Sequence, residues 1–129
     1  PSIAARAESK YPVYAAHMRS LHQRHVDTVG KAVDAGVPVY AGTDAGGTIA
    51  HGQIPTEIRL LSQLRDPLFG LGAASWRARS WLTGDRAAAG LGVGAAADLL
   101  VLDADPRRDV RAIAHPTFVV LRGRVLRDR

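Results

Sequence analysis

One short run constrains the fold of this chain more than any other feature. Residues 37–42, Val-Pro-Val-Tyr-Ala-Gly, are nearly all apolar and follow directly on Gly36. A strand without polar alternation is typical of a parallel sheet that is covered on both faces. Pro38 stands near the start of the run, where a missing N–H does little harm. The run therefore predicts a buried parallel strand, and with it an α/β protein.

A long helix is predicted before this strand, over residues 13–35. Its apolar residues and two of its histidines recur at spacings of three and four and form one stripe: Tyr14, Met18, Leu21, His22, His25, Val29, Ala32 and Val33. Gly36 follows the last turn, as expected of the glycine just after a helix. The order helix, glycine, buried strand is typical of one unit of an α/β fold.

A polar, glycine-rich loop at residues 43–52 follows the predicted strand, and two more helices come after it. In parallel α/β folds, such a loop is where catalytic residues lie. The first helix is predicted over residues 55–65. The second begins after Asp66, a good N-cap, with Pro67 at its first position. Its buried stripe is expected to contain Leu68, Leu71, Ala74, Ser75, Ala78 and Leu82.

The C-terminal part of the chain has the pattern of a small β unit. Short strands separated by turn residues are predicted at residues 97–103, 117–121 and 125–126, with a tight turn at 122–124. We therefore expect two domains: an α/β body over residues 1–85 and a β unit over residues 86–129.

Composition excludes several classes of protein. Of the 17 basic residues, 15 are Arg, and the net charge is +5, but the aromatic content is 5%, which supplies few aromatic side chains on which nucleic-acid bases could stack. The Arg-rich, Ala-rich usage is typical of a GC-rich genome, so we expect no nucleic-acid partner. No apolar run approaches the ~18 residues that span a membrane. The chain has no Cys, which excludes disulfides and thiolate metal sites and suits a cytoplasmic protein.

Three segments carry a resemblance to a known family. Residues 25–46 read HVDTVGKAVDAGVPVYAGTDAG, and His51-Gly52 is followed by a helix with Glu57. The third segment runs from Pro67 through residues 97–103, which read ADLLVLD, to Gly123. In this order they resemble the amidohydrolase superfamily, specifically its imidazolonepropionase-like and prolidase-like metal-dependent hydrolases. The resemblance covers roughly residues 15–126. It implies the C-terminal fragment of a (β/α)₈ barrel, namely its last strand and flanking helices, plus strands of a small β-sandwich.

The resemblance also implies a reaction and its residues. Asp44 matches the family's metal ligand, which takes a proton from the attacking water, and His51 matches a residue near the substrate. The implied cofactor is a divalent metal, Zn²⁺ or a similar ion. The implied reaction is hydrolysis of a C–N bond, in a non-peptide or dipeptide-like amide, by metal-activated water. The family's earlier metal ligands, including a His-x-His pair, have no matching position here, so the chain alone is expected to be inactive.

Plainer interpretations stand beside these. Asp44 could cap a turn, and His51 could be an ordinary surface histidine. The spacing of His22 and His25 could hold a metal, but both lie on the apolar stripe without a carboxylate, so core histidines are expected. His115 is expected in a loop, and Trp76 and Trp81 are expected to pack their helix. The glycines of the loop precede no Lys of a phosphate-binding motif.

Two other functions stay open at the level of the whole chain. It could be a non-catalytic remnant or a structural and interaction domain, or, less in keeping with its composition, a basic nucleic-acid-binding module. Because an apolar strand needs neighbours on both edges, self-association is also expected.

Overall fold

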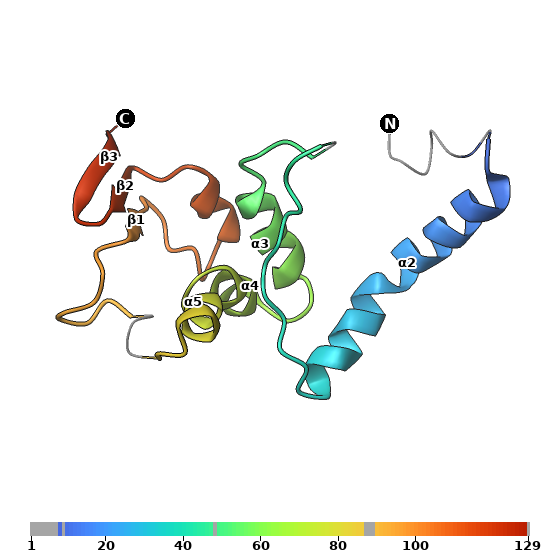
Figure 1. Ribbon diagram of the computed structural model, residues 1–129, viewed down its shortest axis with the longest axis horizontal. Helices are drawn as coiled ribbons and strands as arrows, with labels where there is room; N and C mark the ends of the chain where they lie inside the picture. The colour runs from blue at the N-terminus through green and yellow to red at the C-terminus, as the bar shows by residue number, and fades with distance from the viewer. Residues whose placement is uncertain (1–7, 9, 48, 87–89, 129) are drawn as a thin grey trace. The chain divides into compact units, whose positions relative to one another are not determined.

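The computed structural model describes residues 8, 10–47, 49–86 and 90–128. The elements in chain order are α2 (Pro12–Asp34), α3 (Ile54–Ser62), α4 (Pro67–Ala74), α5 (Trp76–Thr83), β1 (Leu99–Val101), the 3₁₀ helix η2 (Val110–Ala114), β2 (Phe118–Leu121) and β3 (Arg124–Asp128) (Figure 1). The chain divides into two compact units, Pro1–Pro38 and Val39–Arg129. The domain boundary predicted between residues 85 and 86 stays a prediction.

The end of α2 confirms the prediction made from Gly36. Gly36 has a φ of +87°. Its N–H donates to the Val33 carbonyl at 3.0 Å, and the N–H of Val37 donates to the Ala32 carbonyl at 2.9 Å. These two hydrogen bonds form a Schellman motif, which places a glycine in the left-handed region because it has no Cβ.

The predicted apolar stripe of α2 is exposed over its first part and half-buried at Val29, Ala32 and Val33. Ala15 is the buried residue of this helix, whereas Tyr14, Met18 and Leu21 are exposed. His22 and His25 are exposed too, so the prediction of core histidines is wrong. The reason is that the described part of this unit contains no second helix or strand for the stripe to pack against.

Across the described residues, no helix is both long and apolar enough to cross a membrane.

The second unit has a small core where α3 and α4 pack together. The buried hydrophobic side chains of these two helices are Ile58, Leu61, Leu71 and Ala73. The two backbones approach closely at Gly70, since a Cβ built there would run into the Ser62 hydroxyl and the Ile58 carbonyl oxygen. Only a glycine allows this approach.

The predicted helix after Asp66 is in fact two helices. Its start is confirmed, because the Asp66 carboxylate accepts a hydrogen bond from the Phe69 N–H at 2.7 Å. Between α4 and α5, however, Ser75 has φ −133° and ψ −103°, outside the helical region. The predicted buried stripe therefore does not continue, and Leu82 is 74% exposed.

The sheet is antiparallel throughout, with the order β1-β2-β3. Leu99 pairs with Val120, and Leu121 pairs with Arg124 across a two-residue turn. Arg122 and Gly123 in this turn both have positive φ, +50° and +75°, as a type I′ hairpin requires. The three predicted short strands and their tight turn are confirmed; the first two strands are shorter than predicted and the third is longer.

The predicted fold class, an α/β fragment of a (β/α)₈ barrel with its last strand at residues 37–42, is wrong. These residues form no strand. The N–H of Ala41 donates to the Ala73 carbonyl of α4 at 3.0 Å instead of to a neighbouring strand. A parallel strand needs a strand alongside it, and every strand pair in the described residues is antiparallel. The described residues also contain one three-stranded sheet and not the two facing sheets of a sandwich.

Candidate functional site

Asp44 lies in an unusual backbone conformation at the start of the glycine-rich loop. Its φ is +50°, and the only other non-glycine with positive φ in the described residues is Arg122. Asp and Asn visit this left-handed region more readily than other residues, because their short polar side chains bond locally. The Asp44 residue is exposed, and its carboxylate has no hydrogen bond or ion pair to any described residue. Its oxygens can therefore accept a proton or bind a cation.

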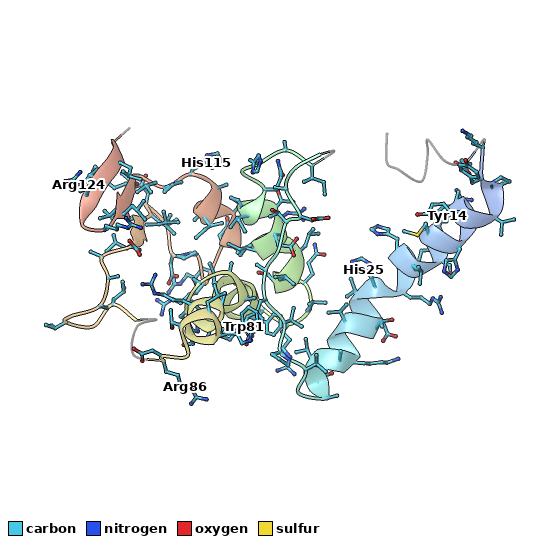
Figure 2. All side chains as sticks on the ribbon, viewed as in Figure 1. Tyr14, His25, Trp81, Arg86, His115 and Arg124 are labelled. Atoms are coloured by element: carbon cyan, nitrogen blue, oxygen red, sulfur yellow. The ribbon has the colours of Figure 1, made fainter. Side chains whose placement is uncertain are left out.

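The segment just before Asp44 is attached to two helices. The N–H of Ala41 reaches the Ala73 carbonyl near the end of α4, where the last carbonyls of a helix have no partner within it. One residue earlier, the Tyr40 ring stacks on the Trp81 ring of α5, with centroids 4.9 Å apart and planes 22° apart. Figure 2 labels Trp81 on α5. Asp44 thus follows an anchored segment by three residues.

Beyond Asp44 the loop folds back on itself. Gly46 and Ile49 exchange backbone hydrogen bonds of 2.8 and 3.0 Å. Both Gly46 and Gly47 have positive φ, at +129° and +55°. The carboxylate of Asp44 therefore stands between an anchored segment and a tight turn.

His51 is exposed in a bend further along this loop, next to Gly52 with its φ of +87°. Within the described residues, its imidazole has no hydrogen bond or ion pair, and nothing links it to Asp44. The structure therefore shows no hydrogen bond or ion pair between the two predicted site residues. The contact of His51 with a substrate stays a prediction.

The other histidines do not complete a metal site. The rings of His22 and His25 stack at 4.9 Å, and His25 Nδ1 contacts the His22 carbonyl oxygen. His115 follows η2 in a loop, as expected. In the part of the chain that the structure describes, no group of three or more His, Cys, Asp or Glu side chains could hold a metal ion. Since a catalytic zinc site uses about three protein ligands, the described residues do not fit a complete one.

A cavity of about 800 Å³ lies in the second unit, and neither Asp44 nor His51 lines it. Its lining is mostly apolar and comes from α4, α5, η2 and the sheet; it includes Leu71, Trp76, Leu102, Ile113 and Val119. The charged side chains at this cavity pair with each other: Arg79 with Asp98 at 3.2 Å and Arg107 with Asp105 at 2.8 Å. The cavity is therefore suited to apolar groups and not to the proposed chemistry of Asp44.

Asp98 has a structural role that was not predicted from the sequence. Its carboxylate accepts a hydrogen bond from the Arg122 N–H at 2.7 Å and one from the Arg79 guanidinium. Both bonds lower the pKa of Asp98, and the bond from the Arg122 N–H has the larger effect. The carboxylate thereby joins α5 to the turn between β2 and β3.

Two more aspartates form a local repeat. Asp105 accepts hydrogen bonds from the backbone and the guanidinium of Arg107, and Asp109 does the same with Arg111. The side-chain hydrogen bonds are the main reason why both carboxyl pKa values fall to about 2. The spacing Asp-x-Arg, repeated four residues apart, is the sequence signal that could have predicted this arrangement.

Comparisons with known proteins give relatives but no established function. No family model matches the chain. Uncharacterized proteins of Mycobacterium tuberculosis and Mycobacterium bovis are 49% identical to it over 121 residues, which are 93% of this chain and 32% of each relative. The chain thus spans about a third of the length of these curated relatives.

A solved structure shares the fold. The crystal structure of an uncharacterized protein matches 98% of this chain with a TM-score of 0.75 and 23% identity. The match covers 34% of that protein. The arrangement described above therefore also occurs within a chain about three times as long.

Proposed function

We propose that this chain is part of a metal-dependent amidohydrolase, an enzyme that hydrolyses a C–N bond in a small-molecule amide or dipeptide-like substrate. The observation that carries the proposal is Asp44. Its exposed carboxylate, which pairs with no described residue, follows an anchored segment and precedes a glycine-rich turn, with the backbone in the left-handed region. The Thr-Asp-Ala-Gly sequence around it, with its family resemblance, supports the same assignment.

Asp44 would act as a proton carrier in this reaction. An ionised carboxylate oxygen accepts a proton from the attacking water as the new C–O bond forms. The same oxygen then delivers that proton to the leaving nitrogen as the C–N bond breaks, which regenerates the carboxylate. His51, in the same loop, would contact the substrate.

The metal needs ligands from elsewhere. Asp44 offers one hard oxygen ligand, and the described residues hold no group that completes a site. The matched segment is 32% of each relative, so about two thirds of each relative lies outside it. We assign the remaining ligands of a zinc or similar ion to the corresponding part of a longer protein. The absence of Cys supports a cytoplasmic location.

One observation favours a second candidate, a non-catalytic remnant or interaction domain. It is the same lack of a ligand group in the described residues. The two candidates differ in what the complete reading frame encodes. The amidohydrolase requires a longer protein with further metal ligands, and a remnant does not.

The test is an assay of the full-length protein encoded by the reading frame that contains these residues. The protein is loaded with Zn²⁺ and offered dipeptides, N-acyl amino acids and cyclic amides, and amine release is measured. We expect hydrolysis of at least one class, lost in Asp44→Asn and kept in Asp27→Asn, a change of another exposed carboxylate. No hydrolysis of any class by the loaded protein would favour the remnant.

A further inference from the structure

Trp81 is a large aromatic side chain whose position the core does not explain. It is 63% exposed, so burial against α4 or the sheet does not hold it. Its neighbour on the same helix, Leu82, is still more exposed. Trp81 does stack on Tyr40.

A second attachment of the same segment lies one residue after Tyr40. Tyr40 meets α5 through its ring, and Ala41 meets α4 through its backbone N–H. The two attachments are of different kinds and lie on different helices. A segment held at one point can swing about it, whereas a segment held at two successive residues by two helices cannot.

The break at Ser75 makes this arrangement possible. Because Ser75 leaves the helical region, α4 ends with a carbonyl available to Ala41, and α5 starts afresh and carries Trp81. An uninterrupted helix would have used the Ala73 carbonyl for its own ladder. Two short helices in place of one therefore create both anchors.

We propose that Trp81 is a positioning residue, which holds residues 39–43 against α5 so that the Asp44 carboxylate is presented in one place. Its consequence for catalysis rests on the proposed function. Trp81 stacks on Tyr40, four residues before Asp44, so it acts through the segment and does not take part in the chemistry. Small displacements of a reacting group cost large factors in rate, which is why such an anchor matters.

The structural half of the proposal is tested on the 129-residue chain by amide hydrogen exchange of Ala41, whose N–H donates to Ala73. Loss of an aromatic pair is expected to speed this exchange by roughly 2- to 10-fold in Trp81→Ala. Trp81→Phe keeps an aromatic face and should restore slow exchange. Leu82→Ala, an exposed neighbour on the same helix, is the matched control and should leave Ala41 unchanged.

Two results would overturn this half. One is unchanged Ala41 exchange in Trp81→Ala. The other is equal acceleration at Arg79, whose N–H donates to the Ser75 carbonyl at 2.8 Å within the first turn of α5, because that would show loss of the helix and not of the anchor. Tyr40→Leu should reproduce the effect of Trp81→Ala if the stack is responsible.

The catalytic half is tested in the full-length enzyme. Trp81→Ala should lower kcat and leave KM unchanged, with rescue by Trp81→Phe. If Asp44→Asn abolishes activity and Trp81→Ala keeps full kcat, the positioning proposal fails and the proposed function stands. If the Ala41 exchange responds as expected but Asp44→Asn stays active, the anchor stands and the proposed function fails.

Discussion

The backbone conformation of Asp44 determines which substitution tests its chemistry. At a φ of +50°, Ala would add strain to the loss of the carboxylate, whereas Asn tolerates the left-handed region as Asp does. Asp44→Asn therefore removes the proton acceptor and weakens a metal ligand with little added backbone strain. Loss of activity in this variant can then be read as loss of the carboxylate's functions and not as loss of the loop conformation.

We expect Asp44→Asn to lower kcat of the full-length enzyme by ~10²–10⁴-fold, the usual cost of removing a positioned general base. The circular dichroism spectrum and the unfolding midpoint should not change. Asp27→Asn, in the ion pair with Lys31 on α2, serves as the control for a lost negative charge. A kcat close to that of the native enzyme would show that the base is another residue.

The two Asp-x-Arg pairs give a pH dependence whose sign follows from their pKa values. The carboxyl pKa values of Asp105 and Asp109 are held at about 2 in the folded chain, below their ordinary value of 3.8. Stabilisation by these pairs is thus fully present above pH 4. It is lost as the pH falls through about 2, because the protonated carboxyls no longer attract their arginines. Both pairs are exposed, so solvent screening keeps the effect small.

Carbon NMR titration of the two carboxyl groups checks this expectation. Arg107→Gln should raise the pKa of Asp105 towards its ordinary value and leave Asp109 low, and Arg111→Gln should do the reverse. Each variant is thus the control for the other. If neither substitution moved its partner's titration, the guanidinium contacts would not be what lowers these pKa values.

At the scale of the elements, the sequence predicted the helix ends and turns that depend on contacts between residues close together in the chain. The end of α2 at Gly36, the cap at Asp66 and the turn at Arg122 each depend on a few neighbouring residues. The conformation of residues 37–42 does not depend on neighbouring residues alone. Their apolar composition indicates that they pack against other groups, but it does not indicate which groups. Here the contacts are two helices and not two strands.

In the candidate site too, local features could be predicted from the sequence and long-range contacts could not. Asp44 and its loop could be singled out from the sequence, because the motif is contiguous. The stack of Tyr40 on Trp81 joins residues 41 positions apart, and the break at Ser75 that places Trp81 carries no glycine or proline to mark it. The sequence therefore pointed to the carboxylate but not to what holds it.

The packing of α3 on α4 depends on Gly70. Gly70→Ala forces a methyl group into the Ser62 hydroxyl and the Ile58 carbonyl oxygen, so the helices must separate. We expect a loss of about 1–3 kcal/mol in the free energy of unfolding, the usual cost of overpacking. The measurement is urea denaturation followed by circular dichroism.

Gly30→Ala is the matched control for this change, because Gly30 is also helical and a Cβ there meets nothing within 4 Å. It should stabilise α2 by up to about 1 kcal/mol, since Ala is the better helix former. Equal effects of the two substitutions would mean that helix propensity, and not the close approach, explains the result at Gly70.

At the scale of the whole molecule, the exposed stripe of α2 gives a reason for self-association that differs from the one expected from residues 37–42. Tyr14, Met18 and Leu21 are exposed on a helix with no packing partner in the described part of its unit. Contiguous apolar surface of this kind favours association. We expect species larger than a monomer at tens of micromolar, measured by sedimentation velocity.

A charge placed in this stripe should weaken the association. Leu21→Glu adds one negative charge within the stripe, and Gln23→Glu adds the same charge outside it. Only the first is expected to shift the sedimentation profile towards the monomer. A monomeric native chain at these concentrations would contradict the prediction, and equal shifts would point to net charge instead of the stripe.

The 129 residues alone should bind Zn²⁺ weakly and hydrolyse no amide. Asp44 supplies one carboxylate, His51 makes no hydrogen bond or ion pair with it, and the described residues form no group of three ligands. A hydrated divalent ion on one carboxylate keeps most of its waters and exchanges readily, since affinity grows with the number of protein ligands held in place. Isothermal titration calorimetry after chelator treatment is the measurement. His22→Gln with His25→Gln removes any weak binding to the paired imidazoles of α2, so the remaining heat reports on the loop. One-to-one binding below a micromolar that disappears in Asp44→Asn would mean that a complete site assembles from this chain after all, either within one copy or where two copies meet.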